Sequence, residues 1–222
     1  MARCNLCGSG SVSLAGSDKH RFFYLCGDCA LVSVPPKYWL SVDDERARYE
    51  LHDNNMSNAG YVKFLSQVVD VATRVVDDVV TDNCLKTGLK VLDFGCGKEA
   101  VACQLLKDKS IDCYGYDPLY GRTLPEPVSK SGQYDIIILC EVIEHLRDIK
   151  RELTRINELL REGGVIILRT QIYESPSSFP SWWYARDLTH VNFFSEKSLS
   201  AAAGMMGKRF EKTEVSDIFL LR

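Results

Sequence analysis

The stretch that decides the fold is Val91-Leu92-Asp93-Phe94-Gly95-Cys96-Gly97. Its apolar start predicts a buried strand, its two glycines predict a turn, and residues 99–107 that follow have a helical pattern. Glycine has no Cβ atom, so the backbone of such a turn can approach a ligand closely. The helix N-terminus adds unpaired N–H groups and a partial positive charge. The stretch therefore predicts a ligand-binding turn between a strand and a helix.

Strand and helix patterns alternate along most of the remaining chain. Further strands are predicted at residues 113–116, 134–139 and 165–169, and helices at 61–80, 149–160 and 198–206. Strands that are almost continuous apolar runs and alternate with helices indicate a parallel sheet covered on both faces. Residues 210–221 could add two last strands, one of them antiparallel. We expect an α/β fold with a doubly wound, mostly parallel sheet.

Near its start the chain carries two CxxC pairs separated by 18 residues, namely Cys4, Cys7, Cys26 and Cys29. Each pair can present two thiolates from one tight turn, and together they suit a tetrahedral zinc ion. Gly8 and Gly27 stand where such turns need a permissive backbone. The alternatives are a redox dithiol, which needs only one pair, and cysteines that merely fill core space. We expect a zinc ribbon over residues 1–45, with a closed and therefore structural metal site.

Composition excludes several classes of protein. The chain has 222 residues, 45% hydrophobic and 26% charged, which is enough for one core and a small module. A net charge of −3 without a long Lys/Arg run argues against a nucleic-acid partner. No stretch approaches the roughly 18 apolar residues that cross a bilayer, so no membrane partner is expected.

The nine cysteines also bear on where the protein works. The first residues lack the apolar segment of a signal peptide. Cysteines in a chain without such a signal favour thiols and metal ligation over a disulfide framework. We therefore expect a cytoplasmic protein. The cysteines at 84, 96, 103, 113 and 140 are interpreted mostly as small core residues, with Cys96 and Cys140 at strand ends.

In order and spacing, four motifs resemble those of the Rossmann-like (class I) S-adenosylmethionine-dependent methyltransferases, and more narrowly the bacterial branch with an N-terminal zinc ribbon. The motifs are VLDFGCG at 91–97, YGYDP at 114–118, YDIIILCEVIEHL at 134–146 and LREGGVII at 160–167. The resemblance implies a seven-stranded-type sheet that could lack one edge strand. It implies a methyltransferase domain at 61–222 and a linker or lid at 46–60. A nicotinamide enzyme is the runner-up, but its fingerprint has a third glycine.

The resemblance also implies a cofactor site for S-adenosylmethionine. Its residues would be Asp93, Gly95, Cys96, Gly97, Asp117, Pro118, Leu119, Cys140, Glu141 and Tyr61. Asp93 would orient the turn or meet the ammonium group through water, and Asp117 would accept hydrogen bonds from the ribose hydroxyls. The alternatives are that Asp117 is a turn residue and that Glu141 caps a helix. The segment 118–133 is too short for the helix and strand that the family usually has there.

Catalytic residues are harder to assign from the sequence. His190 is the first candidate for a base and His145 the second, because histidine titrates near neutral pH. His145 could instead be a core histidine, and Glu144 could pair with Arg147 or Lys150. Residues 182–191 carry two tryptophans, a tyrosine and an arginine, which indicate either a substrate wall or packing against the sheet.

The expected function is methyl transfer to a small polar metabolite such as a sugar. The alternatives are a methyltransferase-like binding module without turnover, and methylation of tRNA or protein.

Overall fold

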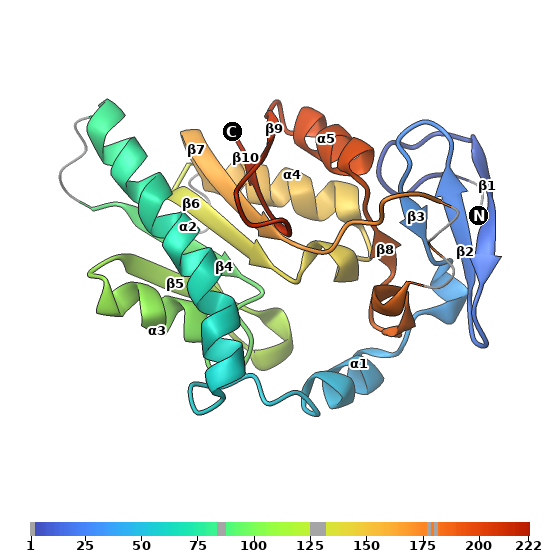
Figure 1. Ribbon diagram of the computed structural model, residues 1–222, viewed down its shortest axis with the longest axis horizontal. Helices are drawn as coiled ribbons and strands as arrows, with labels where there is room; N and C mark the ends of the chain where they lie inside the picture. Colours follow the sequence, from blue (N-terminus) through green and yellow to red (C-terminus); the bar gives the residue numbers. More distant parts are fainter. Residues whose placement is uncertain (1–2, 84–87, 125–131, 177–178, 180–181) are drawn as a thin grey trace. The chain divides into compact units, whose positions relative to one another are not determined.

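The computed structural model of the protein describes residues 3–83, 88–124, 132–176, 179 and 182–222. The chain forms two compact units, each built from separate segments (Figure 1). Unit 1 comprises Met1–Leu51, Ile143–Thr154 and Thr170–Phe210. Unit 2 comprises His52–Val142, Arg155–Arg169 and Glu211–Arg222. The chain passes between the two units several times, and the expected boundaries at residues 45 and 60 stay a prediction.

Unit 2 contains a six-stranded sheet with the strand order β5-β4-β6-β7-β10-β9. The strands are β4 (Lys90–Phe94), β5 (Asp112–Tyr116), β6 (Tyr134–Cys140), β7 (Leu160–Arg169), β9 (Phe210–Lys212) and β10 (Ile218–Leu221). The first four in this order along the sheet are parallel to one another, and β10 runs antiparallel to β7. The sheet confirms the mostly parallel α/β class and the antiparallel tail.

Two helices, α2 (Ala59–Asn83) and α3 (Val101–Asp108), pack on one face of this sheet (Figure 1). Val68 and Val75 of α2 and Leu106 of α3 are buried in one core cluster with strand side chains. Burying one such side chain contributes about 1.5–3 kcal/mol. α2 begins after Asn58, whose side-chain oxygen accepts a hydrogen bond from the Tyr61 N–H at 3.1 Å. Asn58 thus caps the N-terminus of α2.

Unit 1 contains a smaller antiparallel sheet with the order β1-β2-β3-β8. Its strands are β1 (Val12–Ser17), β2 (Phe22–Cys26), β3 (Val32–Ser33) and β8 (Asn192–Phe193). The first three belong to the expected ribbon, but β8 comes from the far end of the chain and pairs Phe193 with Val32. Aromatic rings fill the core on this sheet, including an edge-to-face pair of Phe23 and Phe179 at 5.1 Å. The ribbon is therefore completed by a distant segment.

Several short helices complete the chain. They are α1 (Val42–Tyr49), α4 (Ile149–Leu159) and α5 (Glu196–Met205), and the 3-10 turns η1 (Pro36–Tyr38), η2 (Pro118–Tyr120), η3 (Ile143–His145) and η5 (Trp183–Arg186). The sequence pattern did not predict α1, because its eight residues bury no side chain and so present no apolar stripe. Ser41 begins this helix by accepting a hydrogen bond from the Asp44 N–H, and acidic residues occupy its first turn.

Cys103 and Cys113 form a disulfide, which joins α3 to β5 with their Cα atoms 5.1 Å apart. The interpretation of both as small core residues is confirmed, since both are buried in the core cluster. Their linkage was not predicted, because two cysteines ten residues apart gave no sign that a helix and a strand would bring them together. The cytoplasmic location stays a prediction.

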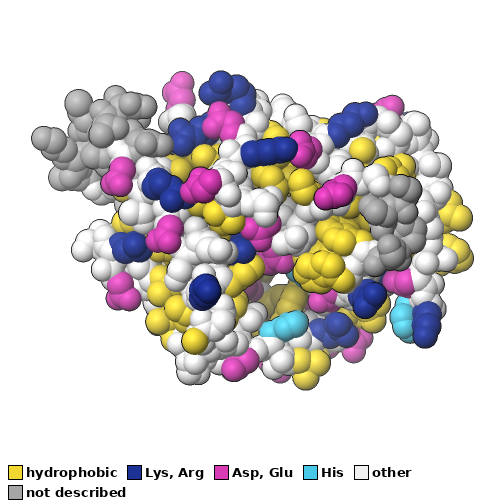
Figure 2. Space-filling view, in the orientation of Figure 1, with side chains coloured by type: hydrophobic (Ala, Val, Ile, Leu, Met, Phe, Trp, Pro, Cys, Tyr) yellow, Lys and Arg dark blue, Asp and Glu magenta, His cyan; other side chains and the backbone are white. Residues whose placement is uncertain are grey.

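Among the described residues, no helix combines the length and the apolar character needed to span a membrane. On the face that Figure 2 shows, Lys and Arg side chains are interspersed with Asp and Glu.

Candidate functional site

The glycine turn after β4 in unit 2 has the geometry that requires glycine. Gly95 has φ +85°, and a Cβ atom on it would lie 2.4 Å from Cγ2 of Val142. Gly97 has φ +69°, but a Cβ atom there would meet no atom within 4 Å. The N–H groups of Gly95 and Cys96 both donate to the Tyr116 carbonyl, at 2.7 and 3.1 Å. The turn is thus fixed to the end of β5, and the space beside Gly97 stays open.

Asp117, directly after β5, joins this turn to the next one. One carboxylate oxygen accepts from the Gly97 N–H at 2.9 Å, and the other from the Leu119 N–H at 3.0 Å. Asp117 therefore does have the turn-forming role considered as an alternative. A carboxylate offers about four lone-pair sites, so both oxygens retain capacity for a further donor. The side chain is mostly buried, at 8% exposed.

Buried acidic groups gather at the ends of β4 and β5. Burial and, to a lesser extent, the nearby charge of Asp117 raise the pKa of Asp93 to about 7, while Arg122 opposes both. Burial also raises the pKa of Cys96 to about 12, which makes this thiol unreactive. Tyr61 has a raised pKa through burial and through the charges of Cys140 and Asp93, which lie near its hydroxyl. Asp93, Cys96 and Tyr61 thus lie close enough in unit 2 for their charges to affect one another.

Strained backbone marks the same strand ends. Glu141, after β6, has φ +53°, and Ala100, before α3, has φ +49°. Residues other than glycine rarely adopt this region, and such outliers cluster at ligand sites. The Glu141 N–H donates to the Arg169 carbonyl at 2.9 Å, which extends the β6–β7 ladder by one residue.

The segment after Asp117 is a tight turn. Asp117 and Arg122 form an isolated antiparallel bridge around η2, which contains the exposed Pro118 and the half-buried Leu119. The Arg122 guanidinium donates to the Lys98 carbonyl at 2.7 Å and so fastens this turn to the glycine turn. Residues 125–131, most of the short segment 118–133, lie outside the described part of the chain.

Three residues important for this arrangement escaped sequence analysis. A Cβ atom on Gly115 would lie 2.8 Å from the Cys96 sulfur, so β5 needs glycine there; a glycine inside a strand was the available signal. Val142 is the residue whose side chain a Cβ atom on Gly95 would meet. Arg169, at the end of β7, donates to the Phe64 carbonyl, to Gln67 and to Asp217 at 2.6–2.9 Å. It fixes α2 against the strand ends.

The four ribbon cysteines of unit 1 lie together, as expected. The Cys4 and Cys29 sulfurs are 3.6 Å apart, as are those of Cys7 and Cys26, and all four lie within 4.8 Å of one another. A hydrogen bond from Cys29 lowers the pKa of Cys4 to about 5, which favours its thiolate. This cluster could hold a metal ion.

The two turns that carry these cysteines use glycine differently. Gly8 has φ +74°, as expected for a permissive turn, but in the second turn Ala30 takes this role with φ +58°. Gly27 is required instead by close approach, because its Cβ atom would lie 2.6 Å from the Ser11 hydroxyl.

Unit 1 also contains a buried carboxylate that sequence analysis underestimated. Glu144 is 0% exposed, and its two oxygens accept hydrogen bonds from the Tyr184 hydroxyl and from the Thr170 hydroxyl, the latter at 3.1 Å. Arg147, one of the two alternative partners considered for Glu144, pairs with Glu45 at 2.8 Å. Glu144 therefore belongs to a polar cluster inside the unit.

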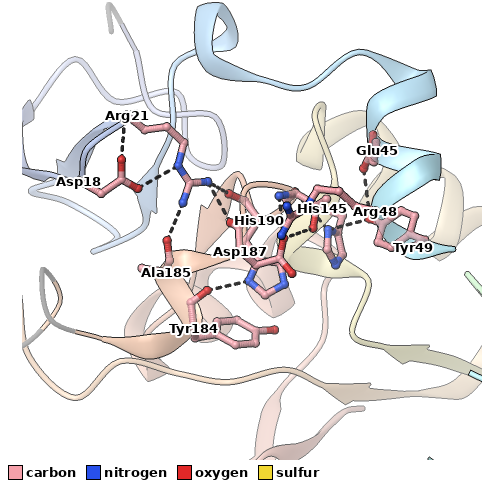
Figure 3. A network of polar contacts seen from close by, with 11 residues as sticks. Asp18, Arg21, Glu45, Arg48, Tyr49, His145, Tyr184, Ala185, Asp187 and His190 are labelled. Atoms are coloured by element: carbon pink, nitrogen blue, oxygen red, sulfur yellow. Dashed lines mark hydrogen bonds and ion pairs between the residues drawn. The ribbon is translucent and has the colours of Figure 1, made fainter. Parts of the chain in front are cut away.

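The ligand-type atoms of Glu144, His145 and His190 lie within 4.8 Å of one another. The rings of the two histidines, which Figure 3 shows next to each other, have centroids 4.7 Å apart. Nδ1 of His190 is 2.9 Å from the Tyr184 carbonyl, and Nδ1 of His145 is 3.1 Å from the Thr189 carbonyl. Carbonyl oxygens only accept, so both Nδ1 atoms carry the hydrogen in these two contacts. Burial lowers the pKa of His190 to about 4, so this ring is neutral at physiological pH.

Arg21 of the ribbon holds the loop that carries His190 (Figure 3). Its buried guanidinium donates to the carbonyls of Ala185, Asp187 and His190 at 2.5–3.0 Å, and to Asp18 at 3.2 Å. Five donors in a fixed fork suit arginine to such a cluster of acceptors.

The two tryptophans of the expected substrate wall lie in different environments. Trp182 packs against Tyr184 at 5.0 Å and against other core rings, which is the packing alternative, while Trp183 is 62% exposed.

Comparisons with known proteins bear on both units. Residues 64–207 match the family described as a methyltransferase domain. The ubiquinone biosynthesis O-methyltransferase of Bradyrhizobium diazoefficiens is 29% identical over 140 residues, which are 54% of this chain and 52% of that protein. A relative of the same name from Nitrobacter winogradskyi is 29% identical over 126 residues. The chain thus spans about half the length of the curated relatives it matches.

Among solved structures, the DszA carbon methyltransferase matches with a TM-score of 0.51 and 14% identity, covering 74% of this chain and 54% of that one. This likeness shows a shared fold.

Proposed function

The chain belongs to the methyltransferase-domain family, and on that premise we propose that it transfers a methyl group from S-adenosylmethionine to a small polar molecule. The observation that carries the proposal is the turn at Gly97. No atom lies within 4 Å of the position that a Cβ atom would take there, and the Gly97 N–H donates to Asp117. Such a turn offers a cofactor both backbone contact and a carboxylate.

Residues at the ends of β4, β5 and β6 would together hold the cofactor. The remaining lone pairs of Asp117 would accept from the ribose hydroxyls, and the space beside Gly97 would take the methionine part. Asp93 would face the ammonium group, directly or through water. The lining would be completed by Gly95, Cys96, Pro118, Leu119, Cys140, Glu141 and Tyr61.

We propose a hydroxyl oxygen as the methyl acceptor, because the curated relatives are named O-methyltransferases. These names give no support to the expected sugar. In the reaction the acceptor oxygen attacks the methyl carbon, a C–O bond forms and the C–S bond breaks. S-adenosylhomocysteine leaves, and the hydroxyl proton must leave as well. Much of the acceleration can come from positioning the two reactants in line.

Loss of that proton is the step that a side chain can assist. We propose His190 as the group that takes up this proton, and His145 as the second candidate. The support is the orientation of both rings, which two backbone carbonyls fix through Nδ1.

We also propose that the four cysteines of the ribbon bind a structural zinc ion. Zinc–sulfur bonds of about 2.3 Å in a tetrahedron put sulfurs about 3.8 Å apart, close to the 3.6 Å of two of the pairs here. Four protein ligands would close the site to substrate, so the metal would supply folding energy to the ribbon.

The experiment that tests the function is a methyl-transfer assay with S-adenosylmethionine and panels of phenols, catechols and sugars. We expect S-adenosylhomocysteine to form with hydroxylated aromatic compounds. Asp117→Ala should weaken cofactor binding by about 1–3 kcal/mol, the usual cost when buried polar groups lose a partner. Asp112→Ala, at an exposed position of the same strand, is the matched control. Cofactor binding without transfer to any acceptor would favour the binding-module alternative.

A further inference from the structure

We propose that Arg169 is a positioning residue of the cofactor site in unit 2. It holds the first turns of α2 and thereby places Tyr61 for contact with S-adenosylmethionine. The inference rests on the proposed function, in which Tyr61 is part of the cofactor lining. Arg169 is the last residue of β7, whereas Tyr61 is the third residue of α2, so the two are remote in the sequence.

The side chain of Arg169 joins three segments of unit 2. It is buried, and it donates to the Phe64 carbonyl at 2.6 Å and to Oε1 of Gln67 at 2.9 Å, both in α2. Its Nε donates at 2.9 Å to Asp217, the residue before β10. The guanidinium carbon also lies 3.5 Å from the centroid of the Phe64 ring, where a cation–π contact is favourable. A planar fork of donors can reach three acceptors at once, which a lysine cannot do.

The start of α2 has need of such an anchor. Of the described residues 59–64 none is buried, and Leu65 is the first residue of the helix in the core. The second residue of the helix is Gly60, and glycine within a helix is destabilising relative to alanine. Arg169 contacts the helix directly after these weakly buried residues. We therefore expect its contacts to decide how closely the first turns of α2 lie on the strand ends.

Tyr61 connects the anchor to the proposed cofactor site. Its ring stacks with that of Phe64 at an interplanar angle of 16°, with centroids 6.5 Å apart. Burial and, to a lesser extent, the charges of Cys140 and Asp93 raise the pKa of Tyr61, so its hydroxyl lies near these two residues of the proposed lining. Phe64 is thus the link, because it contacts Arg169 through its ring and its carbonyl and stacks with Tyr61.

The backbone of Arg169 takes part in the sheet independently of its side chain. Arg169 is paired with Cys140 in the β6–β7 ladder, and its carbonyl accepts from the Glu141 N–H at 2.9 Å. A substitution at this position leaves these backbone contacts in place. It therefore tests the side-chain anchor rather than the strand.

The other end of β7 offers a matched control. Arg161 lies there and donates to both carboxylate oxygens of Asp135, at 2.8 and 3.0 Å. This is an arginine–carboxylate contact of the same strand, at the edge of the sheet opposite to the strand ends that would hold the cofactor. Loss of it should lower the free energy of unfolding and leave the cofactor affinity unchanged.

Calorimetric titration of the full chain with S-adenosylhomocysteine tests the inference. We expect affinity about tenfold lower in Arg169→Met, the size of effect usual when contacts of a charged group are lost. Arg169→Lys keeps the charge beside Asp217 and should show a smaller loss, and Arg161→Met should bind as the unaltered chain does. Without ligand, amide hydrogen exchange of residues 62–68 should become faster in Arg169→Met and not in Arg161→Met.

A double-mutant cycle tests whether the effect passes through Tyr61. Tyr61→Ala should itself weaken binding. When Arg169→Met is added to Tyr61→Ala, the further loss should be less than about twofold, because the ring that Arg169 positions is already absent. If Arg169→Met does not fold, Arg169→Lys takes its place in both experiments.

The outcomes separate this inference from the proposed function. Equal affinity in the unaltered chain and in the Arg169 variant would refute the positioning role and leave the function intact. An equal loss in Arg161→Met would show a general effect of stability and would also refute the role. Losses that are additive in the double variant would refute the route through Tyr61. A chain that binds no S-adenosylhomocysteine at all would contradict the function, and this role of Arg169 with it.

Discussion

The two units of this molecule hold their functional residues by different means. Unit 2 positions its site with backbone: strand ends, two glycines with positive φ and carboxylates that accept from N–H groups. Its support is a continuous apolar core beneath a six-stranded sheet. Unit 1 positions its site with side chains, and two of its four strands have only two residues. A cysteine cluster, a buried arginine and packed aromatic rings take the place of a large sheet there.

This difference predicts where each unit is vulnerable. Unit 2 should respond most to changes of backbone conformation or of cavity shape. Unit 1 should respond most to loss of a metal ligand or of a polar anchor, since its short strands contribute few ladder hydrogen bonds.

The largest effect is expected from Cys29→Ser in the ribbon. Structural zinc sites contribute on the order of 10 kcal/mol to the folding of the residues that hold them. We expect this variant to lose its zinc and the hydrogen-exchange protection of unit 1, while unit 2 keeps its protection. Cys140→Ser, at a thiol outside the ribbon, should keep both. Equal loss of protection in the two units would contradict the expectation that the effect is confined to unit 1.

A smaller loss is expected from Arg21→Leu, which removes the anchor of the loop with His190. Three carbonyls lose their donor, and each buried group without a partner costs about 1–3 kcal/mol, so the free energy of unfolding should fall by at least about 3 kcal/mol. Denaturant titration measures this. Arg46→Leu, at an exposed arginine, should change it by less than about 0.5 kcal/mol. Similar values for both variants would show that Arg21 is no anchor.

In unit 2, the two glycines of the turn should behave differently. Gly95→Ala places a methyl group 2.4 Å from Val142 and should cost about 1–3 kcal/mol of stability. The added change Val142→Ala should recover part of that loss. Gly97→Ala meets no atom and should cost only about 1–2 kcal/mol for its positive φ. It should nevertheless weaken S-adenosylhomocysteine binding, because the cofactor would need that space; unchanged affinity would place the cofactor elsewhere.

The smallest effect concerns pH. Asp93 has a pKa of about 7, raised by burial, so near pH 6 most molecules hold its proton. Binding of an ammonium group favours the carboxylate and releases that proton, so affinity should rise with pH through about 7 and then level off. Between pH 6 and 8 the gain should be about tenfold, or about 1.4 kcal/mol. Calorimetry should find no such rise in Asp93→Asn; a rise that persists there would assign the titration to another group.

The two units also differ in how well the sequence predicted their structure. The strands and helices of unit 2 were predictable, because each apolar run and each helical stripe is a local pattern and Asp93, Gly95 and Asp117 stand at their ends. The pairing of Phe193 with Val32 was not, since two-residue strands leave no periodicity and their partners are remote. The cysteine cluster was predictable from spacing alone. The environment of Glu144 was not, because its donors Thr170 and Tyr184 come from later segments of the chain.

The central claim is that the strand ends of unit 2 bind S-adenosylmethionine through Asp117 and the glycine turn. Calorimetric titration with S-adenosylhomocysteine tests it most directly, with the unaltered chain, Asp117→Ala and Asp112→Ala compared at one pH. We expect one binding site per chain, affinity about 1–3 kcal/mol weaker in Asp117→Ala, and unchanged affinity in Asp112→Ala. Absence of binding to the unaltered chain, or equal affinity in all three proteins, would contradict the claim.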